Sequence, residues 1–560
     1  MQPKQIPLGL HDFRNLISQN YYFIDKSLLI KELLDGGVKV TLFPRPRRFG
    51  KTLNLSMLQY FFEKTPEPHV SLFNNLLVSQ HPEIMKQQGT YPVIFLTFKG
   101  IKSTKWTDCF EDIKAQILAE CIRHRYLLAS NLLAPEEKRN LDEILNKTAP
   151  TTSYKSFLKN LSEYLHRFHG IAPIILIDEY DTPINTAFSE NYYDDCVNFM
   201  RSLLGDGLKD NKYLSFSVIT GILRISKESI FSDLNNLEVC SMTSDLYADK
   251  FGLLEADVQA FLHYYGLSHA LENVKTWYNG YLSGQYLIYN PWSILSCARN
   301  KGKLEPYWIN TSSNTLVKQL VQKSTLEIKE DFEQLIQKKP IRRIINENFV
   351  FPELAQRNDL AWNLLFHSGY LTAHNIHRKS DGKYADFSIP NEEVLDFFKT
   401  SIRDWFERAG GISSAYQEML TALTTGNVPT FADTLSDIAM QTLSSFDVSE
   451  KEPERFYHGL TLGMLLSLMN HYEVKSNKES GSGRYDVMLI PFGLTKRGII
   501  IEFKKVQTHR GETLESAANI ALEQINQRGY DAEMRARRIK TVLKLGIAFE
   551  GKQVLVKEGK

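Results

Sequence analysis

The chain has 560 residues, more than one hydrophobic core usually contains, so its length predicts three or four domains. Its 66 Lys and Arg residues balance 65 Asp and Glu residues, and 43% hydrophobic content with 23% charged content is ordinary for a globular protein. The composition excludes a collagen-like or disordered chain. It argues neither for nor against a nucleic-acid partner, because any basic surface would have to be local.

The cysteines and the apolar segments indicate the cellular compartment of the protein. No two cysteines have the Cys-x-x-Cys spacing of a zinc or redox site, and the pattern favours reduced, buried thiols over a disulfide framework. No uninterrupted apolar stretch reaches membrane-spanning length, and the N-terminus lacks the apolar region of a signal peptide. We therefore expect a cytoplasmic protein with no membrane partner. The five cysteines are Cys109, Cys121, Cys196, Cys240 and Cys297.

The first motif is a strand, a loop and a helix in succession. Val38–Phe43 has the alternation of a strand, and Arg45–Thr52 continues as Arg-Pro-Arg-Arg-Phe-Gly-Lys-Thr into a helical pattern. In such a loop the amides hold phosphate, Lys51 reaches the terminal phosphates and the Thr52 hydroxyl binds magnesium. Arg45 stands where the usual pattern has its first glycine, so the turn must be made differently, although an arginine-rich loop can still face phosphates.

A second motif follows an apolar strand. Ile174–Ile177 has the continuous aliphatic run of a strand in a parallel sheet, and it ends in Asp178 and Glu179. Paired with the loop above, Asp178 is expected to hold magnesium through water and Glu179 to orient the attacking water. A buried strand can also end in solvated acids, but the pairing of the two motifs disfavours that interpretation.

Two further strands and several helices complete this region. Leu214–Thr220 is a third buried strand, whose Thr220 is expected to sense a γ-phosphate that Arg224 could reach, and Pro92–Phe98 is a fourth. Because strands alternate with helices, the region predicts a doubly wound α/β sheet. The expected helices cover residues 110–122, 154–168 and 192–204.

The middle of the chain is less specific. Residues 252–330 are helical and aromatic in pattern, and aromatic residues at that density indicate core packing more than base stacking. An apolar helix, Leu360–Phe366, then precedes two strand-like segments that suggest a hairpin, which favours a winged-helix-like module. Such a module can contact nucleic acid or act as a rigid spacer, and the sequence leaves both open.

Near the C-terminus, two apolar runs carry charged residues at their ends. Asp486 opens the first run, and the second ends in Glu502-x-Lys504, where residues two apart share one face of a strand. If the runs pair as a hairpin, Asp486 joins the other two. Two carboxylates and an ammonium would form a hard-cation site suited to metal-assisted phosphodiester cleavage. The alternative is an exposed hairpin with charged ends.

Many of these segments occur in one order along the chain, and with them the chain resembles a known family: bacterial AAA-ATPase-like proteins with a C-terminal PD-(D/E)XK nuclease-superfamily domain. Arg45 is similar to the family's own loop. The matching segments are Tyr22–Lys26, Arg45–Thr52, Leu176–Asp181, Thr220–Arg224, Phe231–Asn236, Trp277–Tyr281, Tyr289–Trp292, Tyr307–Thr311, Ser368–Leu371, Ile389–Asn391, Phe456–Gly459, Ser476–Asp486 and Ile501–Lys504.

The resemblance implies an α/β multidomain architecture. Residues 1–250 would form a P-loop AAA-like ATPase domain, 251–330 a helical lid, 331–410 a winged-helix-like adaptor, and 411–560 a restriction-endonuclease-like PD-(D/E)XK domain. In that last domain it implies a helix from Glu454, strands carrying Asp486 and Glu502, a helix over residues 512–527 and two final strands.

The combined expectation for the sites is as follows. The catalytic residues are Glu179, Asp486, Glu502 and Lys504; the nucleotide-binding residues are Arg48, Gly50, Lys51, Thr52, Asp178, Thr220 and Arg224; and the metal ligands are Thr52, Asp178, Asp486 and Glu502. Weaker candidates near the nuclease site are Glu454, His458, Glu479, Arg484, Gln524 and Tyr530.

The expected function is an ATP-binding, ATP-regulated nuclease that uses Mg²⁺ or Mn²⁺. Its partner would be nucleic acid, with DNA favoured over RNA, and it could form a homo-oligomer because AAA-like sites often take an arginine from a neighbour. The alternative is a nucleotide-switched module that binds nucleic acid or protein without cutting. A P-loop enzyme that phosphorylates a small molecule is disfavoured by the two further domains and by the Asp178-Glu179 pair.

Overall fold

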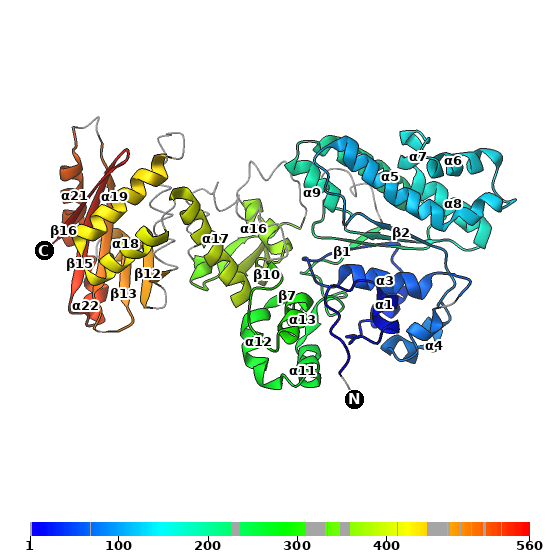
Figure 1. The fold of residues 1–560 in the computed structure, drawn as a ribbon, viewed down its shortest axis with the longest axis horizontal. Coiled ribbons are helices and arrows are strands. Elements are labelled where there is room, and N and C mark those ends of the chain that lie inside the picture. The colour runs from blue at the N-terminus through cyan, green and yellow to red at the C-terminus, as the bar shows by residue number, and fades with distance from the viewer. Residues whose placement is uncertain are drawn as a thin grey trace. The chain divides into compact units, whose positions relative to one another are not determined.

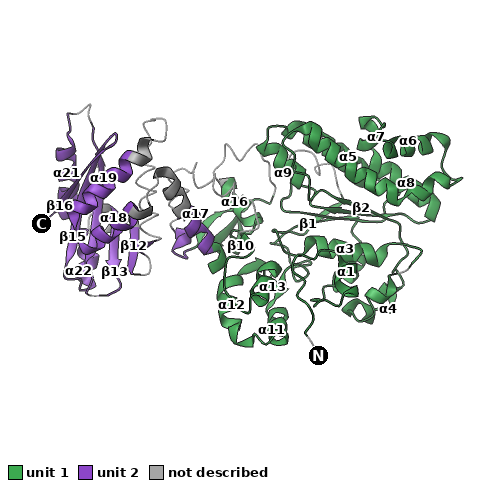
Figure 2. Cartoon of the chain, viewed as in Figure 1, with its two compact units in different colours: residues 1–313, 340–394 green, residues 314–339, 395–560 purple. Residues whose placement is uncertain are grey.

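The computed structural model describes residues 3–67, 69–225, 236–309, 331–332, 334–347, 359–410, 413–444, 467–468, 471–480, 483–493, 495–507, 511–527 and 529–559. The chain divides into two compact units (Figure 2). The first contains residues 1–313 and 340–394, and the second contains residues 314–339 and 395–560. Within the described ranges, each helix is too short or too polar to cross a membrane.

A parallel five-stranded sheet forms the centre of the first unit. Its strands are β1 (Val40–Pro44), β2 (Val93–Thr97), β3 (Ile174–Asp178), β4 (Ser217–Gly221) and β5 (Leu237–Val239), in the order β2-β3-β4-β1-β5. All residues of β1, β3 and β4 are buried, as expected for strands covered on both faces. The four strands predicted from apolar runs are confirmed, with ends shifted by at most three residues, whereas β5 was not predicted.

Helices cover both faces of this sheet (Figure 1). Helices α5 and α8 lie on one face, and α1 and α3 lie on the other. The predicted alternation of strands and helices is therefore confirmed. The helices of this part are α1 (Phe13–Ser18), α2 (Leu28–Gly36), α3 (Lys51–Phe62), α4 (Pro82–Met85), α5 (Trp106–Arg123), α6 (Pro135–Leu145), α7 (Thr151–Lys155), α8 (Phe157–His169), α9 (Thr182–Ser189) and α10 (Tyr193–Leu208).

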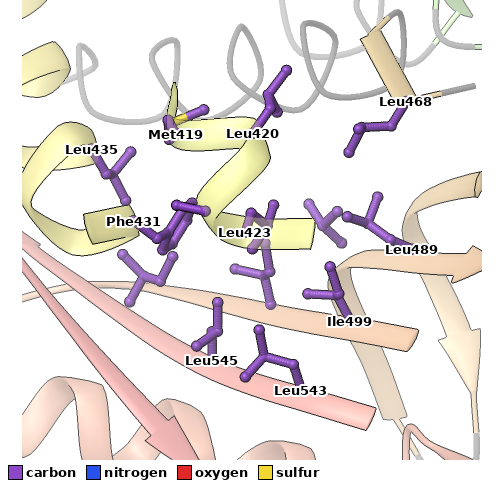
Figure 3. Packing of buried hydrophobic residues seen from close by; sticks show 14 of the residues in the cluster. Met419, Leu420, Leu423, Phe431, Leu435, Leu468, Leu489, Ile499, Leu543 and Leu545 are labelled. Atoms are coloured by element: carbon purple, nitrogen blue, oxygen red, sulfur yellow. The ribbon is translucent and has the colours of Figure 1, made fainter. Parts of the chain in front are cut away.

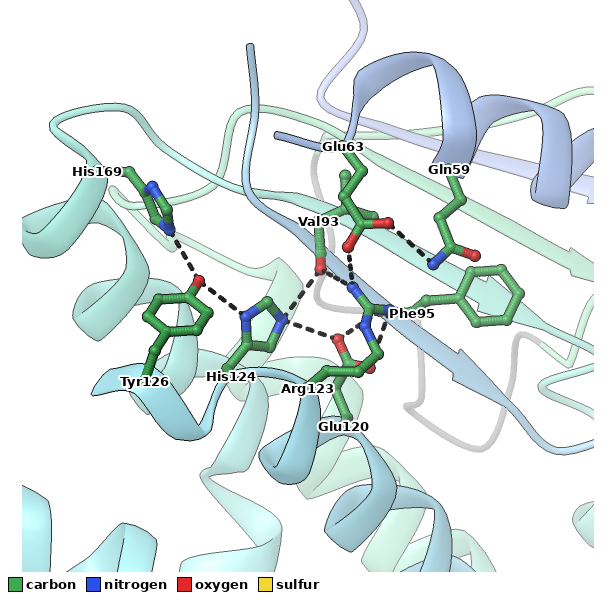
Figure 4. A network of polar contacts seen from close by, with 9 residues as sticks. All are labelled: Gln59, Glu63, Val93, Phe95, Glu120, Arg123, His124, Tyr126 and His169. Atoms are coloured by element: carbon green, nitrogen blue, oxygen red, sulfur yellow. Dashed lines mark hydrogen bonds and ion pairs between the residues drawn. The ribbon is translucent and has the colours of Figure 1, made fainter. Parts of the chain in front are cut away.

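Side chains of α5 occupy the open edge of β2 (Figure 4). The buried Glu120 carboxylate accepts the N–H of Phe95 at 3.0 Å and contacts His124 Nε2 at 3.1 Å. Arg123 donates to the Val93 carbonyl at 3.0 Å. Two backbone groups of this edge, the Phe95 N–H and the Val93 carbonyl, are therefore bonded within the chain, which opposes pairing with a strand of another molecule.

The region expected to be a helical lid contains a small sheet as well as helices. Its helices are α11 (Glu255–Tyr264), α12 (Leu271–Tyr278) and α13 (Pro291–Arg299). Its strands are β6 (Leu253–Leu254), β7 (Tyr281–Ser283) and β8 (Tyr286–Tyr289), in the order β6-β8-β7. Tyr278, Tyr281 and Tyr289 are at most 1% exposed, which confirms that these aromatic residues are core.

The first unit also contains the predicted helix and hairpin. Helix α16 (Asp359–His367) is followed by β10 (Thr372–Lys379) and β11 (Gly382–Ser388), which pair antiparallel. A third strand, β9 (Ile341–Ile344), pairs with β11. Helix α17 (Glu392–Gly410) begins after β11 and continues beyond residue 394, where the second unit begins.

The second unit is a mixed five-stranded sheet covered on both faces by helices. The strands are β12 (Tyr472–Ser480), β13 (Gly483–Pro491), β14 (Gly498–Lys505), β15 (Val542–Glu550) and β16 (Gln553–Gly559), in sequence order across the sheet. Only β14 and β15 pair parallel within this sheet. The helices are α18 (Ser413–Thr425), α19 (Val428–Ser444), α21 (Leu514–Gln527) and α22 (Ala532–Ala536).

The two faces of β13 and β14 pack against different helices. Odd-numbered residues such as Leu489 and Ile499 pack with Leu423 and Phe431 of α18 and α19 (Figure 3). Even-numbered residues pack on the other face with residues of α21 and α22, in a cluster formed by Met488, Ile490, Ile500, Ile525, Tyr530, Met534 and Ile539. The predicted hairpin of the two apolar runs and the helix over residues 512–527 are therefore confirmed.

Candidate functional sites

The loop between β1 and α3 lies at the carboxyl edge of the parallel sheet. Two of its residues have left-handed backbone conformations, Arg48 with φ +67° and Gly50 with φ +84°. The Arg45 N–H donates to the Gly221 carbonyl at 3.0 Å, which ties the start of the loop to the end of β4. Gly50 has open space where a Cβ would lie, so glycine serves its backbone angle there and not its packing.

The ammonium of Lys51 lies inside this loop. It donates to the carbonyls of Arg45 at 2.9 Å and Pro46 at 2.8 Å, and the residue is only 5% exposed. Burial lowers the pKa of Lys51, while the nearby carboxylates of Glu179, Asp181 and Asp178 oppose that shift. A buried cation held only by carbonyl oxygens is well placed to exchange them for an anion.

Asp178 gathers hydroxyl groups from two other segments. Its Oδ2 accepts the Thr52 hydroxyl at 2.9 Å, and its Oδ1 accepts the Thr220 hydroxyl at 2.8 Å. Burial and then the charge of Glu179 raise the pKa of Asp178, whereas the two hydroxyls and Lys51 lower it. The structure thus brings Thr52, Asp178 and Thr220 together, and a carboxylate beside a hydroxyl is a suitable ligand pair for Mg²⁺.

Glu179 and Asp181 have different positions although they are close in sequence. Glu179 has φ +51°, accepts the Thr182 hydroxyl at 3.2 Å and lines the cavity described below. Asp181 is buried and accepts the N–H groups of Ile222 and Leu223, both at 2.9 Å. Asp181 therefore fixes the chain that follows Thr220, a role that we did not predict.

A cavity of about 260 Å³ opens beside the loop. Its cationic lining residues are Arg47, Arg48, Lys51, Lys99 and Lys102; its apolar lining includes Pro7, Leu10, Leu16, Pro291, Trp292 and Leu295. The Arg48 guanidinium carbon lies 4.1 Å from the centre of a Trp292 ring. A lining that combines several cations with apolar groups suits a ligand with phosphates and an apolar, planar part.

Not every predicted residue reaches this cavity. Gly50, Lys51, Thr52, Arg48 and Glu179 line it, and Asp178, Thr220 and Arg224 are not among its lining residues. Lys99 and Lys102, in the loop after β2, were not predicted. Their only sequence signal was two cations after a buried strand.

Arg45 points away from the phosphate side of the loop. Its side chain is fully buried and donates to the Cys240 carbonyl at 2.5 Å, with its guanidinium carbon 5.1 Å from the centre of the Phe251 ring. Burial lowers the pKa of Arg45 to about 10. Of the loop arginines, Arg47 and Arg48 line the cavity and Arg45 does not.

The second candidate site lies in the other unit, where the pairing of β13 and β14 ends. The last register pair is Val487 with Ile501, so Asp486 and Glu502 come next on the two strands. Asp486 Oδ2 accepts the Phe503 N–H at 2.7 Å, and the backbone N–H of Asp486 donates to the Glu502 carboxylate. Lys504 Nζ lies 3.5 Å from Glu502 Oε1. The structure therefore brings all three predicted residues together.

Glu502 is in an unusual electrostatic environment. The residue is 2% exposed, and burial, then the charge of Asp486, raises the pKa of Glu502 to about 7 although Lys504 opposes this shift. Among the described residues, its Oε2 has no hydrogen-bond partner. An unpartnered buried carboxylate oxygen is costly, and a bound cation would remove that cost.

The donor set at this site fits a divalent ion that keeps several water ligands. In the part of the chain that the structure describes, no group of three or more His, Cys, Asp or Glu residues could hold a metal ion. The carboxylates that the structure brings together here are those of Asp486 and Glu502. Mg²⁺ is commonly held by one or two carboxylates together with water and substrate phosphates, so the residues present fit it.

Helix α21 covers the face of the sheet on which Glu502 lies. Gly546 is the register partner of Glu502 on β15, and a Cβ there would come within 2.4 Å of the Ala518 carbonyl oxygen. Glycine at this position therefore lets α21 approach the sheet beside the site. Gln524 on α21 donates to the Tyr530 hydroxyl at 3.2 Å, which connects it to the buried cluster on this face.

The weaker candidates are only partly described. Glu454 and His458 lie outside the described residues. Glu479 and Arg484, expected to flank the loop before Asp486, are register partners on β12 and β13, on either side of the connection between these strands. Their side chains are outside the described part of the structure.

Comparisons with known proteins match two regions of the chain to family models. Residues 7–231 match the family model described as "Predicted AAA-ATPase", and residues 452–559 match the model of the PD-(D/E)XK nuclease superfamily. A protein of Azotobacter chroococcum mcd 1, named "Uncharacterized protein in vnfD 5'region", is 24% identical over 572 residues, which cover 98% of this chain and 97% of that protein.

A solved structure was also matched. It is a chain in the structure of the Aeropyrum pernix ORC1 protein in complex with DNA, 13% identical, and the match covers 66% of this chain and 90% of that chain with a TM-score of 0.21. A likeness at that score supports no conclusion about this chain. The two family matches do: the chain is an AAA-ATPase-like protein with a C-terminal domain of the PD-(D/E)XK nuclease superfamily.

Proposed function

We propose that this protein binds ATP with Mg²⁺ and is a nuclease that hydrolyses phosphodiester bonds of nucleic acid with Mg²⁺ or Mn²⁺, under control of the bound nucleotide. The observation that carries the proposal is the buried, unpartnered Oε2 of Glu502, beside Asp486 and Lys504. The match of residues 452–559 to a nuclease superfamily supports the same chemistry.

Asp486 and Glu502 would hold the divalent ion. Such an ion, when bound, supplies a hydroxide from its water and neutralises charge on the phosphate. The Phe503 N–H fixes the Asp486 carboxylate, and the Lys504 ammonium is about one-third exposed, so it can reach both Glu502 and an incoming phosphate. Lys504 would orient the attacking water or stabilise the charge that develops on the phosphate.

In the other unit, Thr52 and Asp178 would hold Mg²⁺ with the nucleotide. Lys51 would exchange the Arg45 and Pro46 carbonyls for the terminal phosphates, and Glu179, which lines the cavity, would orient the attacking water. Thr220 already bonds Asp178, so it is placed to respond to the terminal phosphate. We further propose DNA in preference to RNA as the substrate, and a homo-oligomer as the working form.

The test is a cleavage screen of the full chain. Single- and double-stranded DNA and RNA are incubated with Mn²⁺ or Mg²⁺, with and without ATP, and the wild type is compared with Asp486→Asn and Lys504→Ala. We expect metal-dependent cleavage that both variants lose by at least about 100-fold, as for loss of a transition-state contact. The matched control is Glu558→Gln, an exposed carboxylate of β16, which should cleave like the wild type.

The second candidate function is a nucleotide-switched binding module whose nuclease-like domain does not cut. It is favoured by the presence of only two carboxylate ligands among the described residues of the site. Calorimetry with Mn²⁺ separates the two: heat of binding that Glu502→Gln removes supports the nuclease. No binding to the wild type, together with no cleavage in any nucleotide condition, would favour the module.

A further inference from the structure

The start of helix α17 is held by residues that belong to neither site. The Glu393 carboxylate is fully buried and accepts the Ser293 hydroxyl at 2.7 Å and the Trp308 N–H at 2.8 Å. Ser293 lies on α13, next to Trp292 of the nucleotide cavity. Glu393 therefore joins the first turn of α17 to the helix that lines the cavity.

Two more contacts fix the residues just before α17. Asn391 donates through Nδ2 to the Asn279 carbonyl at 2.9 Å, and its Oδ1 accepts the Val394 N–H at 3.1 Å. Gly280 has φ +108°, and a Cβ there would lie 2.1 Å from the Pro390 carbonyl oxygen. No side chain fits at position 280, so the backbone at Gly280 packs directly against Pro390, just before α17.

The segments that hold α17 also contact the loop between β1 and α3, residues 45–50, which we call the phosphate loop. Asn290, the cap of α13, donates to the Arg47 carbonyl at 3.3 Å, and the Tyr281 ring packs edge-on to Phe49 with centroids 5.1 Å apart. A Cβ on Gly369 would lie 2.9 Å from the Pro46 side chain. Through Asn290 and Tyr281, the elements that hold α17 therefore contact the loop at Arg47 and Phe49, while Gly369 contacts it separately at Pro46.

The loop itself has an internal contact that a ligand would change. Lys51 holds the carbonyls of Arg45 and Pro46, and a phosphate that takes up the Lys51 ammonium releases both carbonyls. Pro46 is the residue against which Gly369 packs, and Arg48 stacks on Trp292, the neighbour of Ser293. A change at Arg48 therefore acts on Trp292, and through the backbone of α13 on Ser293, whose hydroxyl Glu393 accepts.

We propose that the Ser293–Glu393 contact couples the nucleotide state of the phosphate loop to helix α17, which makes Glu393 a positioning residue for nucleotide control of the C-terminal unit. The inference rests on the proposed function. Helix α17 begins in the first unit at Glu392 and continues as one helix into residues of the second unit, which contains Asp486 and Glu502. One helix thus contains both the residues held by these contacts and residues assigned to the second unit.

The experiment measures two responses of the full chain to ATP with Mg²⁺. Hydrogen exchange reports the protection of residues 45–52 and of α17, and the cleavage assay reports the ratio of rates with and without ATP. In the wild type we expect ATP to protect both segments and to change the cleavage rate on the order of fivefold or more, as is typical of coupled sites. Glu393→Gln and Ser293→Ala should still protect residues 45–52 but lose the response of α17 and the change in rate.

Conservative and control variants separate coupling from folding. Ser293→Thr keeps the hydroxyl and should respond to ATP like the wild type. If Ser293 had only a structural role, Ser293→Thr and Ser293→Ala would have the same ratio of cleavage rates with and without ATP. Asp396→Asn, a carboxylate one turn further along α17, is the matched control and should respond like the wild type. If Glu393→Gln fails to fold, the comparison of Ser293→Ala with Ser293→Thr tests the coupling by itself.

The outcomes for the inference and for the proposed function are distinguishable. An α17 segment that responds to ATP equally in the wild type and in Ser293→Ala overturns the coupling, whether or not the protein cleaves. Absence of cleavage by the wild type overturns the nuclease proposal instead, and the exchange data still decide the coupling. Absence of an α17 response in the wild type, while residues 45–52 are protected, also overturns it.

Discussion

Single residues of the phosphate loop differ sharply in what they contact, although their side chains are alike in charge. Lys51 lies beside the cavity, while Arg45 is buried against Cys240 and Phe251, with its Nε and Nη2 unpartnered among the described residues. A buried charge with unsatisfied donors is a weak contributor to stability, and an apolar side chain of similar volume can replace it at little cost.

We therefore expect Arg45→Met to bind ATP with nearly wild-type affinity and to keep or raise the unfolding temperature. Lys51→Met, which removes the cation beside the cavity, should lose most of the ATP affinity. Calorimetric titration with Mg·ATP and thermal unfolding of both variants check this. Loss of ATP binding in Arg45→Met, with an unchanged unfolding temperature, would show that Arg45 contacts phosphate after all.

Glu393 provides a prediction of pH dependence. Burial raises its pKa from the usual 4.5 to about 8, while the hydrogen bonds that it accepts oppose the shift. Between these two values the folded state holds a proton that the unfolded state has lost, so this group's contribution to stability falls as the pH rises from 4.5 to 8. The titratable groups that interact with it are Tyr278, Tyr281 and Tyr307, whose pKa values are all raised above the usual 10 and which stay neutral in this window.

The measurement compares wild type with Glu393→Gln, so that the titration of all other groups cancels. The difference in unfolding midpoint, wild type minus variant, should become more negative as the pH is raised from 5 to 8. A difference that is constant over this range would mean that Glu393 has an ordinary pKa in the folded protein.

At the scale of whole elements, strand β2 forms an edge of the parallel sheet, and a side chain of α5 bonds a backbone group there in place of a neighbouring strand. Glu120 accepts the Phe95 N–H that a neighbouring strand would otherwise bond (Figure 4). Glu120→Ala leaves this donor unpaired, and the loss of a buried hydrogen bond costs about 1–3 kcal/mol. We expect a lower unfolding midpoint, with some self-association as the edge is uncovered.

Denaturant unfolding and light scattering of Glu120→Ala test this edge. The matched control on the same helix is Glu111→Ala, whose side chain is 64% exposed and pairs only with Lys114 at the surface. An exposed ion pair of this kind contributes little, so the control should be within about 0.5 kcal/mol of the wild type. Equal effects of the two variants would mean that Glu120 does not protect the edge.

The elements that the sequence predicts well are those whose burial requires a regular pattern of apolar residues. The strands of the first unit that are buried on both faces are continuous apolar runs, so β1, β3 and β4 were recognisable. Strand β5 has three half-buried residues, and β6, β7 and β8 have two to four residues each. Such short strands exist because tertiary contacts pair them, and no local period reveals that.

The same distinction applies to the sites. Thr52, Asp178 and Thr220 could be brought together from sequence because the carboxyl ends of parallel strands and the loop after β1 meet at one edge of the sheet. Asp181 supports the following loop through backbone N–H groups, and Lys99 enters the cavity from a loop without a motif. These two roles and the burial of Arg45 depend on how the loops pack, so they could not be derived from the sequence.

At the scale of the whole molecule, the cavity beside Lys51 and the cluster of Asp486, Glu502 and Lys504 are built entirely within separate units. The residues that line the cavity belong to residues 1–313, and Asp486, Glu502 and Lys504 belong to residues 395–560. Each site can therefore be disabled without altering a residue of the other. The net charge of +1 over 560 residues also means that attraction of nucleic acid must come from local groups and not from the chain as a whole.

This separation predicts that the two activities can be lost independently. Asp486→Asn should bind Mg·ATP like the wild type and cleave nothing. Lys51→Met should still bind Mn²⁺ at the C-terminal site, as calorimetry would show, but its cleavage should no longer change when ATP is added, because the ammonium that senses the phosphate is gone. Removal of metal with EDTA should stop cleavage, and added Mn²⁺ should restore it, since Glu502 and Asp486 act through the ion. If cleavage by Lys51→Met still responds to ATP, nucleotide control does not act through the phosphate loop. If EDTA leaves cleavage intact, the site at Glu502 is not the one that cuts.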